Sequence, residues 1–151
     1  MLSDHQLPQH WSIALIARVL FTSLFFLSGV THFTNMPYYL SLMPAKIPYP
    51  VFLIQVSGVV ELAGAAMILL NWRPRLGGWL LVAFLIPVTL VVHGHELLTE
   101  TDPVIWALQQ AHFLKGFSLM GAALLVTQLG VELPTVKPSS SKETDTAHIA
   151  T

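Results

Sequence analysis

The sequence predicts an all-α integral membrane protein, a four-helix antiparallel bundle, and two observations support this prediction. The first is composition, because 54% of the 151 residues are hydrophobic and only 10% are charged. A soluble domain usually has about twice that charged fraction. The second is the presence of four apolar stretches, each long enough to cross a hydrocarbon core, which takes ~20 helical residues. So few charges cannot cover a water-soluble globule, so a soluble enzyme is disfavoured.

The predicted spans are residues 11–33, 49–71, 76–94 and 106–130. Each is expected to be a helix, because strands would leave backbone amides unpaired in lipid and no alternating pattern is present. The predicted transmembrane domain covers residues 11–132, after a short leader at 1–10. The leader has no Lys or Arg and the first apolar run is too long for a signal peptide, so we expect the first span to be retained. The tail, 133–151, has too little apolar surface to fold and is expected to be disordered.

The connections between the spans predict the topology. Arg73-Pro74-Arg75 separates the second and third spans by so few residues that they must be antiparallel neighbours. Residues 34–48 combine prolines with Tyr38 and Tyr39, which is typical of a short interfacial helix. Residues 95–105 are expected to form an acidic connection.

The distribution of Lys and Arg predicts the orientation in the membrane. Four basic residues lie on one side of the predicted membrane and one on the other, namely Arg73, Arg75, Lys137 and Lys142 against Lys46. Because basic residues gather on the cytoplasmic side, both termini are expected to be cytoplasmic.

Net charge and cysteine content exclude several functions. The formal net charge is −1 and there is no basic stripe, so nucleic acid is not an expected partner. The chain has no cysteine, so it carries no disulfide, thiol relay, thiolate zinc site or iron–sulfur cluster of its own. Any redox role must therefore use another group.

Three charged residues fall inside the predicted spans, namely Arg18, Glu61 and Lys115. Such charges cost at least ~2.5 kcal/mol each and usually face a bundle interior or a water-filled cavity. At ~1.5 Å per residue, all three lie within roughly 10 Å of the membrane midplane, so they can meet. We hypothesise an ion pair between Arg18 and Glu61, with Lys115 either neutral at rest or paired with an anionic or carbonyl-bearing ligand. The alternative is a structural clasp that joins three helices.

Small and polar residues near these charges predict inward-facing surfaces. One stripe of the first span, at steps of four and three, contains Arg18, Thr22, Phe25, Gly29 and His32. On the second span Glu61 is accompanied by Gly58, Gly64 and Ala65, which allow close helix approach.

Histidines near the span ends form a second candidate cluster. Four of them are expected near the outer leaflet, namely His32, His93, His95 and His112. A metal or haem would need imidazoles on facing helices. Histidines at span ends more often reach interfacial water or cap helix ends, so no metal site is predicted. Thr89 lies one turn before His93 and Pro87 is expected to bend the helix, so His93 is a candidate proton relay.

Six short motifs occur in a fixed order over about residues 13–130: Ile16-Ala17-Arg18-Val19, Phe26-Leu27-Ser28-Gly29, Val60-Glu61-Leu62, Trp72-Arg73-Pro74-Arg75, Val91-Val92-His93-Gly94 and Phe113-Leu114-Lys115-Gly116. In these motifs the chain resembles the DoxX family of small four-span membrane proteins. The resemblance implies a four-helix bundle in the bacterial inner membrane, in a family named after a subunit of a thiosulfate:quinone oxidoreductase. It also implies that the family's polar positions fall on Arg18, Glu61, His93 and Lys115. His32 and Gly116 depart from the family pattern, where Lys and Asn are common.

The first functional hypothesis is a quinone-linked or accessory subunit of a membrane redox system. The quinone carbonyls would accept hydrogen bonds from Lys115 or His93. The side chains expected around the ligand are Thr22, Phe25, Phe26, Gly29, His32, Thr89, His112 and Phe113. The expected partners are the lipid bilayer and either a redox protein or a second copy of this chain.

Two other hypotheses remain open at this point. One is a structural or partner-binding membrane protein without a small ligand, in which the polar groups fix helix register. The other is a carrier for a small anion or a proton-coupled carrier that uses the excess positive charge. Four helices without an internal repeat are few for alternating access, unless the protein dimerises.

Overall fold

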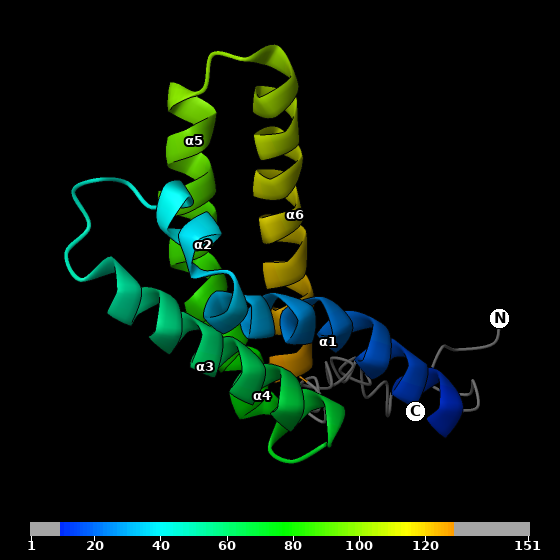
Figure 1. The fold of residues 1–151 in the computed structure, drawn as a ribbon. Coiled ribbons are helices and arrows are strands. Elements are labelled where there is room, and N and C mark those ends of the chain that lie inside the picture. The colour runs from blue at the N-terminus through cyan, green and yellow to red at the C-terminus, as the bar shows by residue number, and fades with distance from the viewer. Residues whose placement is uncertain (1–9, 129–151) are drawn as a thin grey trace, which may run out of the picture.

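The computed structural model describes residues 10–128, which are helical with short connections and contain no strand (Figure 1). The elements in chain order are α1 (Trp11–Thr34), α2 (Met36–Leu42), α3 (Pro50–Leu69), α4 (Pro74–Pro87), the π-helix η2 (Val88–His93), α5 (Gly94–Thr99) and α6 (Pro103–Thr127). The all-α prediction is confirmed. The tail predicted at 133–151 and nearly all of the predicted leader lie outside the described residues.

Proline opens each of the three long helices after α1. Pro50, Pro74 and Pro103 stand at the first positions of α3, α4 and α6. Proline is favoured there because its missing N–H needs no partner and its φ is already helical. The start of α6 is also capped, since the Asp102 carboxylate accepts from the backbone N–H groups of Val104 and Ile105 at 2.8 and 3.1 Å.

The connection between α3 and α4 turns the chain back within four residues. Two of its residues, Asn71 and Arg73, have left-handed backbone conformations with φ of 54° and 49°. Asn tolerates this region well, while Arg73 is held there directly before Pro74, where helical φ/ψ is disfavoured. α3 and α4 are therefore antiparallel neighbours, as their short connection predicts.

Glycines mark the places where the helices touch. A Cβ at Gly29 would meet Leu62 and the carbonyl of Gly58, so α1 and α3 cross there. A Cβ at Gly77 would lie 2.7 Å from the carbonyl oxygen of Gly64, so α3 and α4 are also in close contact. α4 and α6 are in similarly close contact at Gly78. The order of packing thus follows the chain, from α1 to α3 to α4 to α6.

The third predicted span differs from the structure at its end. α4, η2 and α5 form one continuous helical segment, Pro74–Thr99, which runs beside α6 (Figure 1). The prediction ended this span at residue 94, so the first residues of the expected acidic connection, up to Thr99, are helical instead. Pro87 cannot donate a backbone hydrogen bond, and the ladder changes to π-helical bonding directly after it.

Three helical segments are long and apolar enough to cross a membrane: Trp11–Thr34, Pro50–Leu69 and Pro74–Thr99. They expose large apolar side chains such as Leu20, Leu27 and Val59, which suit contact with lipid. The chain is therefore an integral membrane protein. α6 forms a 25-residue helix where the fourth span was expected, but its polar residues, including Gln109 and Lys115, lower its hydropathy. Four crossings remain a prediction.

Candidate functional site

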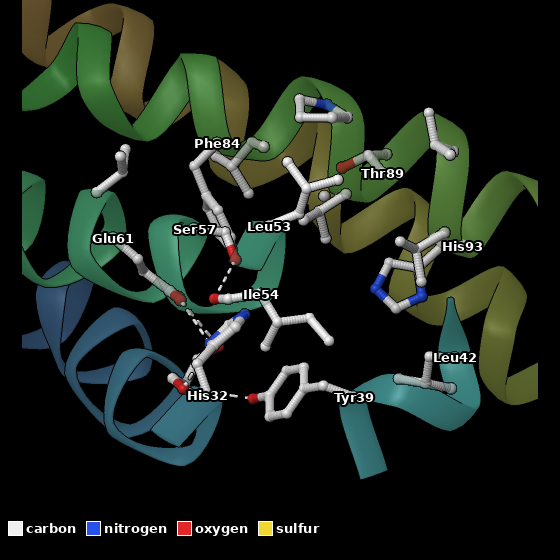
Figure 2. A pocket seen from close by; sticks show the side chains of 18 of the residues that line it. His32, Tyr39, Leu42, Leu53, Ile54, Ser57, Glu61, Phe84, Thr89 and His93 are labelled. Carbon is white, nitrogen blue, oxygen red and sulfur yellow. Dashed lines mark hydrogen bonds and ion pairs between the residues drawn. The ribbon is translucent and has the colours of Figure 1, made fainter. Parts of the chain in front are cut away.

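A cavity of about 570 Å³ lies between the α1–α3 pair and the α4–η2–α6 segments, with α2 beside it (Figure 2). Its volume is within the usual range for a small-molecule site. Most of its lining is apolar and includes Phe25, Ile54, Val60, Phe84 and Val88. Figure 2 shows Glu61 and His93 on opposite sides of the cavity, with Leu53 and Ile54 between them. The cavity thus has two polar ends separated by apolar walls.

Glu61 is the centre of the first polar end, which we call the acidic end (Ser28, His32, Tyr39 and Glu61). This carboxyl group is only 1% exposed. The Ser28 hydroxyl donates to its Oε2 at 3.2 Å, and Nδ1 of His32 lies 3.4 Å from the same oxygen. The other oxygen, Oε1, has no hydrogen bond or ion pair among residues 10–128. The acidic end therefore retains a hydrogen-bonding position for a ligand.

Tyr39 of α2 fixes the His32 ring in place. Its ring stacks on His32 with 4.0 Å between centroids, and its hydroxyl bonds to Thr31 Oγ1 at 2.6 Å. Nδ1 of His32 also lies 2.9 Å from the Ser28 carbonyl oxygen, so a proton on Nδ1 has two acceptors. Phe84 meets the same imidazole edge-on, with 6.0 Å between centroids. The acidic end is therefore held by α1, α2, α3 and α4 together.

The second polar end, which we call the basic end, consists of His93, Gln109, His112 and Lys115. Nδ1–H of His93 donates to the side-chain oxygen of Gln109 at 3.0 Å, and its ring lies 5.3 Å from that of His112. Lys115 follows His112 by one helical turn and also lines the cavity. Its ammonium group has no hydrogen bond or ion pair within residues 10–128. The basic end thus offers donors that the fold itself does not use.

Thr89 lies between Phe84 and His93 along the helix and has an unusual hydroxyl group. The side chain is 0% exposed, and Oγ1 has no hydrogen-bond partner. A helical threonine normally donates to a carbonyl one turn earlier, but Thr89 lies in the π-helical segment. Its side chain packs against Gly116, where a Cβ would collide with Oγ1. The hydroxyl group is therefore enclosed against α6, and its burial without a partner costs stability.

Replacing Thr89 by valine is expected to raise the free energy of unfolding of the ligand-free protein by about 1 kcal/mol. The reason is that a buried hydroxyl without a partner carries a desolvation cost that an isosteric methyl group removes. Thermal unfolding in detergent measures the change. The matched control is Thr22→Val, because the buried Thr22 hydroxyl donates to the Arg18 carbonyl at 2.7 Å. Equal destabilisation by both substitutions would show that the Thr89 hydroxyl has a partner.

The predicted ion pair between Arg18 and Glu61 is wrong, because Glu61 contacts Ser28 and His32 instead. The reason is the antiparallel register, in which Gly29 of α1 packs against Leu62 of α3. Arg18 precedes Gly29 by eleven residues, which is about 16 Å along the helix axis. Arg18 is half-buried on α1 and does not line the cavity.

The other predicted site residues divide into two groups. The cavity is lined by Phe25, His32, Glu61, Thr89, His93, His112 and Lys115. Four lie elsewhere: Thr22 is buried within α1, Phe26 packs against the hydrophobic core, Gly29 packs against α3, and Phe113 packs against Phe117. The stripe from Thr22 to His32 faces inward as predicted, but only part of it reaches the cavity.

Sequence reasoning missed four polar residues of the cavity region, namely Ser28, Tyr39, Ser57 and Gln109. Ser28 precedes His32 by four residues, so the helical period could have placed it on the same face of the helix. Gln109 precedes His112 by three residues and Lys115 by six, so the helical period could have pointed to it as well. Tyr39 had no such signal, because its contact with His32 depends on how α2 folds back over α1.

The histidines do not form the single cluster that their predicted positions suggested. His32 belongs to the acidic end, and His93 pairs with His112 at the basic end. His95 contacts Glu96, with 3.7 Å between Nδ1 and Oε1. Within residues 10–128 no three His, Asp or Glu side chains gather closely enough to hold a metal ion.

The fold and the cavity together define a helical membrane protein with a largely apolar interior site that has an acidic and a basic end. The DoxX family model matches residues 13–94, which is more than half of the chain, and the protein belongs to the DoxX family. Searches of curated proteins and of solved structures gave no match.

Proposed function

We propose that the protein binds a quinone in this cavity and acts as a quinone-linked or accessory subunit of a membrane redox system. The observation that carries the proposal is the apolar cavity with an available ammonium donor, Lys115, at one end and an available carboxyl oxygen, Glu61 Oε1, at the other. A quinone has a flat apolar ring with oxygen atoms on opposite carbons. Ligand sites of this kind are mostly apolar with a few polar groups that fix orientation.

One wall of the cavity connects the two polar ends. Phe84 contacts His32 at the acidic end, and Thr89 packs against Gly116, which follows Lys115. Phe84 and Thr89 are five residues apart, a distance of about 8 Å along a helix. This segment of α4 and η2 thus lines the cavity from the acidic end toward the basic end.

The chain's own residues would bind and orient the quinone. Lys115 or His112 donates to one ring oxygen, Glu61 contacts the other, and the apolar walls exclude water from the ring faces. The quinone supplies the electron chemistry, since the sequence has no cysteine for thiol or cluster chemistry. The DoxX resemblance, with its implied link to a thiosulfate:quinone oxidoreductase, supports the same function.

We place the protein in a bacterial inner membrane with both termini in the cytoplasm. Support for the orientation comes from Arg73 and Arg75 in the α3–α4 connection, against Lys46 at the opposite end of α3. Glu61 and Lys115 then lie near the membrane midplane, in the middle of α3 and α6, whereas His32 and His93 lie toward the outer half of the membrane. A redox partner protein would supply or remove electrons from that position.

The test is equilibrium binding of a short-chain benzoquinone to the purified full-length protein in detergent, with thermal stabilisation as a second readout. Binding raises the free energy of unfolding as ligand exceeds the dissociation constant. Ser57→Phe is expected to abolish binding, because the Ser57 side chain lines the cavity and a phenyl ring fills it. Its control is Val59→Phe on the exposed face of the same helix. Equal affinities in the two variants would exclude this cavity as the site.

A further inference from the structure

The hydroxyl and N–H protons at the acidic end are already used within the protein. The Ser28 hydroxyl donates to Glu61 Oε2, and the Ser57 hydroxyl donates to the Ile54 carbonyl at 2.8 Å. The Tyr39 hydroxyl has Thr31 and the Ser28 carbonyl as partners, and Nδ1 of His32 has the same carbonyl and Oε2. What remains for a ligand is the second carboxyl oxygen of Glu61 and Nε2 of His32, which accepts when the proton is on Nδ1. With Glu61 ionised, the acidic end therefore offers only acceptors to a ligand.

The two redox forms of a quinone differ in what they present to such a site. The oxidised ring has only carbonyl oxygens, which accept hydrogen bonds, whereas the reduced ring has hydroxyl groups, which both donate and accept. An ionised carboxyl group only accepts, and a protonated one both donates and accepts. A ligand hydroxyl therefore fits Glu61 in either protonation state, while a ligand carbonyl fits only the protonated state.

The charged donor of the basic end does not distinguish the two forms. The Lys115 ammonium group is a donor, and it can donate to a carbonyl oxygen or to a hydroxyl oxygen. Nδ1–H of His93 is used by Gln109, which leaves Nε2 of this ring as an acceptor beside His112. The acceptors that face the cavity, Glu61 and the unused imidazole nitrogens, therefore set any preference between the redox forms, and among them only Glu61 can carry a negative charge.

We propose that this cavity selects the reduced, dihydroxy form of the ring over the oxidised form, with Glu61 accepting the hydrogen bond of one ring hydroxyl. The proposal rests on quinone binding in the cavity. The protein would hold the reduced form, and Glu61 would set the preference for it. The protein would then serve as a site that retains the reduced carrier for a partner that oxidises it.

The experiment measures the affinity of one short-chain benzoquinone, and separately of its reduced form under anaerobic conditions, for the native protein in detergent. The reduced form is expected to bind about tenfold more tightly, which corresponds to one hydrogen bond to a charged or polar group. The dimethyl ether of the reduced ring, which has oxygen acceptors but no hydroxyl donor, is expected to bind as weakly as the oxidised form. This probe separates hydrogen-bond donation from changes in the ring.

Two variants test whether Glu61 sets the preference for the reduced form. Glu61→Gln places an amide N–H₂ donor in the acidic end, so it is expected to strengthen binding of the oxidised form, weaken binding of the reduced form and bring the ratio of their affinities close to one. Lys115→Met is the matched control, which is expected to weaken both forms by the same factor. A purely structural role of Glu61 would change both affinities together and leave their ratio unchanged.

The outcomes separate the two proposals. If neither form binds, the proposed quinone function fails and this inference fails with it. If both forms bind with equal affinity, quinone binding stands and selection of the reduced form is overturned. The wild-type ratio and the dimethyl ether result decide the question even if a Glu61 variant does not fold.

Discussion

Valine in place of Gly77 is expected to reduce the free energy of unfolding by about 3 kcal/mol, the upper end of the usual cost of overpacking. A Cβ at this position would lie 2.7 Å from the Gly64 carbonyl oxygen and 3.0 Å from the side chain of Ile68. A backbone carbonyl cannot rotate away as a side chain can, so α3 and α4 would have to separate. Because Glu61 lies one turn before Gly64, the acidic end of the cavity would open as well.

Thermal unfolding followed by circular dichroism in mild detergent measures this effect. The matched control is Gly121→Val on α6, because a Cβ at Gly121 would meet nothing within 4 Å. That substitution is expected to change the free energy of unfolding by less than about 0.5 kcal/mol, as for an open surface position. Similar losses in both variants would mean that helix propensity, and not the α3–α4 contact, sets the stability.

The inward faces of α1 and α3 could be predicted because a membrane leaves few favourable positions for polar side chains. A charged or polar group in lipid is costly, so Glu61 had to face the interior, and the helical period then placed Gly58 and Ala65 beside it. The structure buries all three. The same reasoning placed Phe25 and His32 on the buried stripe of α1.

The partner of Glu61 could not be predicted, because periodicity gives the face of each helix but not the register between helices. Depth in the membrane made Arg18 a reasonable partner, since both residues fell near the midplane. The register is set by the close contact of Gly29 with Gly58 and Leu62, and small residues elsewhere in α1 and α3 allowed other crossings. Once that crossing is known, Ser28 and His32 must be the neighbours of Glu61.

The composite third helix shows a second limit of the sequence pattern. Pro87 indicated a disturbance, but it did not indicate whether the helix would kink, end or change its bonding. The π-helical bonding after Pro87 places Thr89 against Gly116 and His93 against Gln109. These contacts depend on how α6 packs along η2, which no local pattern in either segment encodes.

Leucine in place of His32 is expected to reduce the free energy of unfolding by about 2 kcal/mol, the cost of leaving a buried polar group without its partner. The imidazole is 4% exposed and lies 3.4 Å from the Glu61 carboxyl group. The substitution also removes the stacking with Tyr39. Thermal unfolding in detergent measures the loss. The control is His112→Leu, because the half-buried His112 has a ring neighbour, His93, but no carboxylate within ion-pair distance among residues 10–128.

The double variant His32→Leu with Glu61→Leu determines whether the acidic end acts as a coupled unit. Two leucines leave neither an unpaired carboxyl group nor an unpaired ring, so the double variant is expected to be more stable than the sum of the single losses by about 1 kcal/mol. Additive losses would contradict the contact between the two side chains. If the double variant is stable but no longer binds the reduced quinone, the pair is not required for assembly and exists for the ligand. A double variant that no longer assembles would instead support the structural clasp.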